Sequence, residues 1–134
     1  MNTTELEKNI RKIISELSDQ NGYISSIDVL LKLNYLSQKD YDDWRFGKIV
    51  YLEKVCKANL HKLSTINQII RQISNQMNLK PSWTAYNKYG KGATTRLRFS
   101  KSGDEKIENG YSTHYVNEYH INKMKENKNT IISG

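Results

Sequence analysis

The sequence lacks the features that would indicate a secreted, membrane-spanning or metal-binding protein. Cys56 is its only cysteine, so no internal disulfide can form, and no set of Cys and His residues has the spacing of zinc ligands. No stretch approaches the roughly 18 apolar residues of a membrane span. The first ten residues include Glu5 and Glu7 and contain no apolar signal-peptide core. We therefore expect a cytoplasmic location, no membrane association, and no bound metal or cofactor.

Residues suited to catalysis are also scarce. Histidine occurs three times. The acidic cluster Asp40, Asp42 and Asp43 has no accompanying histidine motif of the kind that metal-dependent phosphodiester cleavage requires. The glycines around Lys91 form too short a loop to cradle a phosphate, and no Ser or Thr follows in the required place. We expect no enzymatic activity, with a small nuclease as the alternative.

Acidic residues are absent from one long stretch of the chain. Residues 54–103 contain ten Lys and Arg and no Asp or Glu, whereas the segments before and after it mix both signs, and the whole chain carries a net charge of +7. A coding sequence rich in A and T would raise the lysine content everywhere but would not remove acids from fifty consecutive residues. Such a segment creates a local positive field that attracts polyanions.

Apolar residues recur at helical spacing over much of the chain. Thr4 and Glu7 form a capping box at the first helix, which Asn21-Gly22 ends. Ser25 or Ser26 caps a second, short helix. The predicted helices cover residues 4–21, 26–33, 38–46, 49–56, 59–79 and 105–119, and Pro81 ends the fifth of them.

The apolar period changes from helical to alternating after Ser82, which predicts an antiparallel hairpin at about 82–100 with its loop at Gly90-Lys91-Gly92. Trp83, Leu97 and Phe99 fall on the inner face of this hairpin. The fold class is therefore α+β and mostly helical: a helical bundle with a two-stranded antiparallel hairpin, which makes it winged-helix-like. We expect one domain over 1–121 and a polar, frayed tail over 122–134.

The outward face of the hairpin is the first candidate for binding. Lys and Arg neutralise phosphates, and an exposed aromatic side chain can stack on a base. A winged-helix protein also uses a hairpin that follows a helix to contact nucleic acid. The alternative is a solvated edge whose cations prevent aggregation. The candidate residues are Tyr86, Lys88, Lys91, Arg96, Arg98 and Lys101.

The polar face of the 59–79 helix is the second candidate. It carries Gln68, Arg71, Gln72 and Asn75 and no acid. Gln and Asn can pair with adenine, and Arg with guanine. The alternative is an ordinary polar face turned to solvent.

Residues 25–52 are similar in outline to the helix-turn-helix of excisionase and MerR-type proteins, which also place a Trp and a Gly-Lys after the second helix. Here these are Trp44 and Gly47-Lys48. The resemblance implies DNA binding, but Asp40, Asp42 and Asp43 would face phosphate on the second helix. We therefore expect this segment to be scaffold, with Trp44 and Phe46 buried.

Three strings of the sequence resemble a group of short uncharacterised bacterial proteins: W-R-F-G at 44–47, P-S-W-T-A-Y at 81–86 and L-R-F-S-K-S-G at 97–103. The resemblance spans most of the chain and implies no activity.

These features together predict a nucleic-acid-binding protein, with DNA favoured over RNA, that docks a basic hairpin and a helix on the phosphate backbone. The alternative is a phage or mobile-element accessory protein that binds a protein or nucleoprotein partner. Tyr86 and Tyr89 would then serve as exposed anchors.

Overall fold

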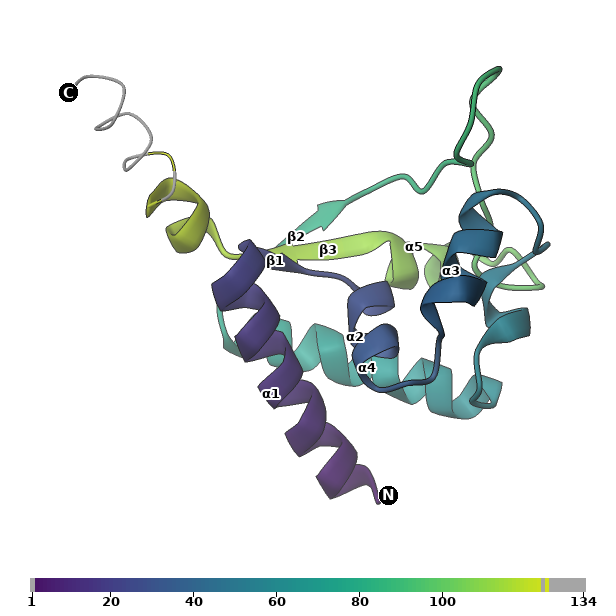
Figure 1. Cartoon of the computed structure of the whole chain (residues 1–134). Helices are drawn as coiled ribbons and strands as arrows, with labels where there is room; N and C mark the ends of the chain where they lie inside the picture. Colours follow the sequence, from purple (N-terminus) through teal and green to yellow (C-terminus); the bar gives the residue numbers. More distant parts are fainter. Residues whose placement is uncertain (1, 124, 126–134) are drawn as a thin grey trace.

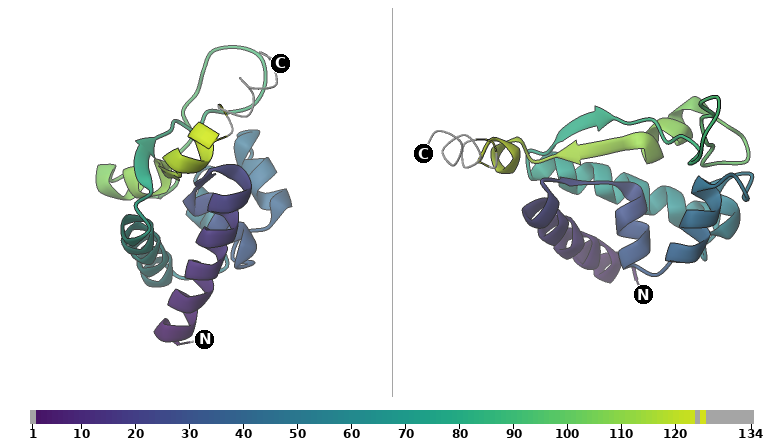
Figure 2. Two further views of the ribbon diagram at one scale, coloured as in Figure 1. Left: turned by 90° about the vertical axis from the view of Figure 1, so that its left-hand side faces the viewer. Right: turned by 45° about the horizontal axis from the view of Figure 1, so that its top comes forward.

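The fold consists of a three-stranded antiparallel sheet with helices on one side of it (Figures 1 and 2). The computed structural model describes residues 2–123 and 125, and it confirms the mostly helical α+β class. A further helical stretch covers 118–123. The elements are α1 (Thr3–Asn21), β1 (Tyr23–Ile24), α2 (Ser26–Lys32), α3 (Gln38–Arg45), η1 (Leu52–Val55), α4 (Leu60–Gln76), β2 (Lys80–Trp83), α5 (Glu105–Ser112) and β3 (Thr113–Val116).

The sheet has the order β1-β3-β2, with Val116 of β3 opposite both Tyr23 and Lys80. The central strand is therefore the last of the three in sequence, and it joins two strands that lie far apart in sequence. A helix leads into each outer strand, and a long connection links β2 to β3. The sheet therefore has three strands, where the sequence predicted a two-stranded hairpin.

Side-chain caps explain where the first helices begin. Asn2 accepts a hydrogen bond from the backbone N of Glu5 at 2.9 Å, so Asn2 rather than the predicted Thr4 is the N-cap of α1. The predicted serine cap of α2 is confirmed as Ser25, and Ser37 caps α3 in the same way. Gly22 ends α1 in the left-handed conformation at φ 82°, as predicted.

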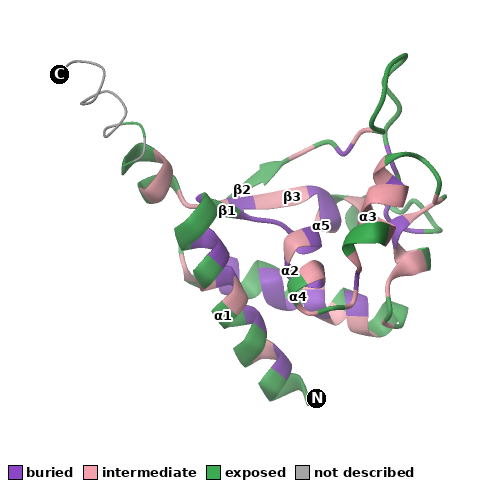
Figure 3. Ribbon diagram, viewed as in Figure 1, coloured by how far each residue is buried: buried purple, intermediate pink, exposed green. Residues whose placement is uncertain are grey.

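The longest apolar stripe after α1 belongs to α4. Asn59 caps it, and Leu63, Ile66, Ile70 and Ile73 are buried along one side, where α4 packs on α1 (Figure 3). The helix ends at Gln76, and the left-handed Asn78 (φ 58°) follows its C-cap Met77. Pro81, which we expected to end the helix, lies within β2.

The predicted helix over 49–56 is a single 3-10 turn, η1. The backbone N of Leu52 donates to the carbonyl of Arg98 at 3.1 Å, and that of Glu53 donates to the carbonyl of Phe99 at 2.8 Å. These amides pair with a distant segment, which limits the helix to one turn.

The predicted helix over 105–119 is also shorter than expected. It ends at Ser112, and the next four residues form the central strand β3. Pairing on both edges of β3 outweighs the local helical spacing of Tyr111, Tyr115 and Tyr119. The first two of these are buried, whereas Tyr119 is 72% exposed.

The predicted hairpin over 82–100 is present only in part, because β2 pairs with β3 rather than with residues 96–100. Within the β2–β3 connection, the backbone N of Leu97 donates to the Tyr86 carbonyl, and the N of Lys88 donates to the Thr95 carbonyl, both at 2.8 Å. One isolated bridge joins Asn87 and Arg96. The result is a narrow loop that projects from the body of the molecule (Figures 1 and 3).

Three aromatic residues form the centre of the core beside this loop. Trp44 is fully buried, as predicted, with its ring centroid 5.0 Å from that of Phe99 and 5.9 Å from that of Tyr86. The three strings noted above therefore meet in space. Phe46, which we expected to be buried, is 53% exposed because α3 ends before it.

The predicted frayed tail begins at 122, but helical structure continues through 123, and most of the tail lies outside the described residues. Within the described chain, no helix combines the length and apolar character needed to cross a membrane.

Candidate nucleic-acid interface

The outer face of α4 carries polar side chains and one cation. Gln68, Arg71, Gln72 and Asn75 are all exposed, on the side of the helix away from its buried stripe. No Asp or Glu occurs in α4. All four predicted residues of this helix are therefore available to a ligand.

A groove of about 820 Å³ separates α4 from α5 and the turn at 100–102. We call it the α4–α5 groove. The groove is lined by Arg71 and Gln68 on the side of α4 and by Lys101 and Lys106 on the other side. The structure thus brings together Gln68, Arg71 and Lys101, which lie on separate segments of the sequence. Lys106 also lines the groove, but the sequence did not predict it as a site residue because it lies outside the acid-free stretch 54–103.

One acid, Glu53, also lines this groove. Its carboxylate accepts a hydrogen bond from the Tyr111 hydroxyl at 2.7 Å. Burial raises the pKa of Glu53 above its ordinary value, although the hydrogen bond from Tyr111 opposes that shift. Three cations against one partly buried acid leave the groove positive.

The turn that carries Arg98 and Lys101 is held by Glu108 of α5. The Glu108 carboxylate accepts from the backbone N of Phe99 and of Ser100, both at 2.9 Å, and from the Ser100 hydroxyl at 2.6 Å. Since these donors occupy it, Glu108 fixes the turn instead of pairing with a nearby cation. The Arg98 guanidinium donates a hydrogen bond to the Lys101 carbonyl, and this bond fixes the orientation of the Arg98 side chain.

A second depression, the Trp83 cleft, has a volume of about 500 Å³ and is lined by Trp83, Arg96 and Arg98. One acid, Glu108, also lines it, and its carboxylate accepts the three hydrogen bonds described above. The guanidinium carbon of Arg96 lies 4.5 Å from the Trp83 ring centroid. Trp83 is 50% exposed, and its indole N–H donates to Asn109 at 3.1 Å. Ser102 lines both this cleft and the α4–α5 groove, so the two depressions adjoin.

Tyr86 does not have the exposed position that strand alternation predicts. It is 7% exposed, packs on Trp44 and Phe99, and its hydroxyl lies 2.7 Å from His114 Nε2. Burial raises the pKa of its hydroxyl. Trp83, predicted to point inward, supplies the exposed aromatic surface in its place.

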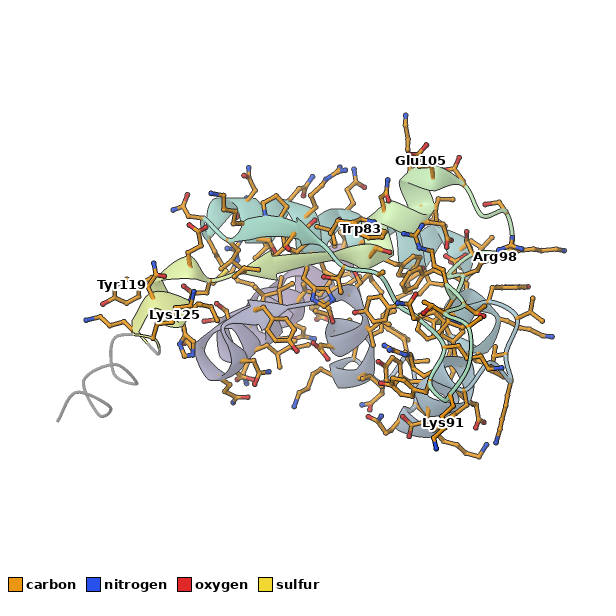
Figure 4. All side chains as sticks on the ribbon, turned by 90° about the horizontal axis from the view of Figure 1, so that it is seen from above. Trp83, Lys91, Arg98, Glu105, Tyr119 and Lys125 are labelled. Atoms are coloured by element: carbon orange, nitrogen blue, oxygen red, sulfur yellow. The ribbon has the colours of Figure 1, made fainter. Side chains whose placement is uncertain are left out.

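The remaining predicted residues, Lys88 and Lys91, are exposed near the tip of the loop. There Tyr89 packs against the end of α3: its backbone N donates to the Arg45 carbonyl at 2.7 Å, and its ring contacts Phe46. Figure 4 shows Lys91 well separated from Trp83. The loop-tip lysines therefore lie apart from the two adjoining depressions.

Five cations line the two depressions, and we call them the basic track: Arg71, Arg96, Arg98, Lys101 and Lys106. Within residues 2–123 and 125, the only cation of the 54–103 stretch that forms an ion pair is Lys80, whose Nζ lies 3.5 Å from Glu118. In the same part of the chain, no three His, Cys, Asp or Glu side chains come together in a way that could hold a metal ion.

Comparison of the chain with protein-family models, with curated proteins and with solved structures finds no match.

Proposed function

We propose that this protein binds nucleic acid, with the basic track on the phosphate backbone and the outer face of α4 beside it. One observation carries the proposal: five cations from α4, α5 and residues 96–101 line two adjoining depressions, and none of them has an acidic partner within the described chain. Unpaired cations along one path match the regular negative charge of a nucleic-acid backbone.

The parts of this surface have different roles in the proposed complex. The cations of the basic track hold and orient the backbone without reading sequence. Gln68, Gln72 and Asn75 are the groups on α4 that could hydrogen-bond base edges. Trp83 offers a partly exposed ring on which a base could stack. We favour DNA over RNA because an exposed helix fits the wide major groove of DNA, whereas that of RNA is deep and narrow.

The test is fluorescence anisotropy with labelled duplex DNA, single-stranded DNA and structured RNA, each titrated across salt. Neutralising about five phosphates of duplex DNA gives a slope of log affinity against log salt of roughly −4 to −5. Arg96→Ala with Arg98→Ala should weaken binding and flatten the slope by about 2. Arg71→Ala with Lys101→Ala should do the same from the α4–α5 groove.

The matched control is Lys8→Ala with Lys12→Ala. These two exposed lysines lie on α1, on the side opposite its buried stripe, so the variant loses the same charge away from the basic track. The control should keep the wild-type slope. Equal slopes in all variants, or no binding at low salt, would overturn the proposal.

A protein or nucleoprotein partner is the second candidate, and two exposed aromatics favour it, one at the end of α3 and one near the tip of the loop. Phe46 is 53% and Tyr89 42% exposed, and their ring centroids lie 5.5 Å apart. Exposed aromatic residues are frequent anchors in protein interfaces. A protein that co-purifies through nuclease treatment and high salt, and is lost with Phe46→Ala, would support this candidate.

A further inference from the structure

A third cleft, of about 450 Å³, lies among β1, α2, α3, residues 84–86 and β3. We call it the Arg45 cleft. Its lining includes Asp28, Arg45 and His114, none of which belongs to the basic track. It therefore calls for an explanation separate from nucleic-acid binding.

Arg45 places a positive charge in this cleft among aromatic rings. Its guanidinium carbon lies 5.9, 5.2 and 4.1 Å from the ring centroids of Tyr41, Tyr86 and Tyr89. Nη1 donates to the Tyr41 hydroxyl at 3.1 Å, but Nε is buried and has no hydrogen-bond partner. Among the described residues no carboxylate lies within ion-pair distance of Arg45. A partly buried cation without a counter-charge is unfavourable, and an anionic group in the cleft would relieve that cost.

Asp28 supplies the opposite charge on another wall. One of its carboxylate oxygens accepts from the Ser25 hydroxyl at 2.9 Å. No cation of the described chain lies within ion-pair distance of it. Since Asp28 would repel a simple anion, the best complement to this cleft carries both charges.

His114 and Tyr23 complete the wall nearest the sheet. Their rings stack with centroids 5.4 Å apart and an interplanar angle of 7°, and His114 Nε2 lies 2.7 Å from the Tyr86 hydroxyl. Burial lowers the pKa of His114, which keeps the imidazole neutral at physiological pH. Arg45 and Asp28 are then the two formal charges that line the cleft. Its remaining walls combine three tyrosines and His114 with aliphatic and small polar side chains.

We propose that the Arg45 cleft binds a small zwitterion of the α-amino-acid class, with the ligand carboxylate at Arg45 and its ammonium group at Asp28. A guanidinium pairs with a carboxylate through parallel N–H donors, which gives direction as well as charge. The cleft volume falls within the range of about 300–1,000 Å³ that small-ligand sites occupy. The tyrosine rings and the aliphatic Ile27 and Leu31 offer contacts to the side chain of the ligand.

The experiment is a titration of the full ¹⁵N-labelled chain with each of the common amino acids, followed by backbone amide shifts, with affinities from calorimetry. Acetate and methylamine serve as ligands that carry one charge each. At least one amino acid should shift the amides of residues 25–28, 84–86 and 114. It should bind about tenfold or more tightly than either single-charge ligand.

Two variants locate the charges. Asp28→Asn and Arg45→Gln should each weaken amino-acid binding by about tenfold or more. Asp19→Asn and Lys32→Gln, at exposed positions outside the cleft, are the matched controls and should bind as the wild type does. Because Arg45 is packed among tyrosines, its variant could fail to fold, in which case Asp28→Asn decides the question.

Three results would overturn the proposal: no amino acid shifts the cleft amides, acetate binds as well as any amino acid, or Asp28→Asn binds with wild-type affinity. No nucleic acid is present in this experiment. Its outcome is therefore independent of the outcome of the salt titrations above.

Discussion

Trp44 joins α3 to the segment that follows the projecting loop. Its ring is fully buried, and its indole N–H donates to the Arg98 carbonyl at 2.8 Å. Trp44→Ala should lower the free energy of unfolding by about 3–5 kcal/mol, because it removes both a large buried ring and a hydrogen bond. Denaturant unfolding followed by far-UV circular dichroism measures this loss.

Phe46 is the natural comparison, two residues further along the chain. Since it is 53% exposed, Phe46→Ala should change the free energy of unfolding by only about 0.5 kcal/mol. Similar losses in the two variants would mean that Trp44 does not have the central packing role described above.

Cys56 should be chemically inert in the folded protein. Burial raises the pKa of its thiol to about 12, with a further contribution from the negative charges of Glu53 and Asp40. The thiolate is the reactive form. Alkylation at about pH 8 should therefore be roughly a hundredfold or more slower in the native protein than in denaturant. Equal rates would show that the folded protein does not shield this partly buried thiol.

At the scale of elements, α5 acts as a support for the turn that carries Arg98 and Lys101. Glu108→Ala removes the acceptor of three hydrogen bonds and should destabilise the protein by about 1–3 kcal/mol. It should also weaken nucleic-acid binding if the turn belongs to the interface, although it removes a negative charge.

Glu105→Ala is the matched control on the same helix, where the side chain is exposed. It removes the same charge without touching the turn, so it should leave stability unchanged and binding unchanged or slightly stronger. If both variants bind alike, the turn does not depend on Glu108.

The strand β3 should make stability depend on pH through His114. Burial lowers the pKa of His114 below its ordinary value of 6.5, although Asp28 opposes the shift. Well above pH 6.5 the imidazole is neutral in both the folded and the unfolded state, so it does not affect stability. As the pH falls below 6.5, the unfolded chain binds a proton before the folded chain does, so stability is lost. Unfolding curves between about pH 8 and pH 5 should show this loss, and His114→Gln should reduce it.

The helices were largely predictable and the strands were not. The caps Ser25 and Gly22 act within a few residues of sequence, so local patterns reveal them. In contrast β1 has two residues and β3 has four, and each is stabilised by partners far away in the chain. Helical spacing through Tyr111, Tyr115 and Tyr119 therefore predicted a helix where the sheet has its central strand.

At the scale of the whole molecule, the acid-free stretch indicated which part of the chain carries unpaired charge. The sequence pattern could not show that folding places these cations in two separate parts of the surface. Arg96, Arg98 and Lys101 lie beside Arg71 along the two depressions, whereas Lys88 and Lys91 lie at the end of the loop by α3. The sequence also could not show that Tyr86 is buried and Trp83 exposed, the reverse of the prediction. This outcome depends on the packing of Tyr86 against Trp44 and Phe99.

The position of β3 in the sheet also bears on how the chain folds as it is made. A ribosome releases β1 and β2 well before residues 113–116, and in the finished sheet neither outer strand pairs with the other. Until β3 emerges, a nascent chain can form helices but no sheet. Forming the sheet then brings together segments about ninety residues apart, and the loss of chain entropy makes this step slow. A translating chain would then carry α1 and α4 for some time before the sheet can form.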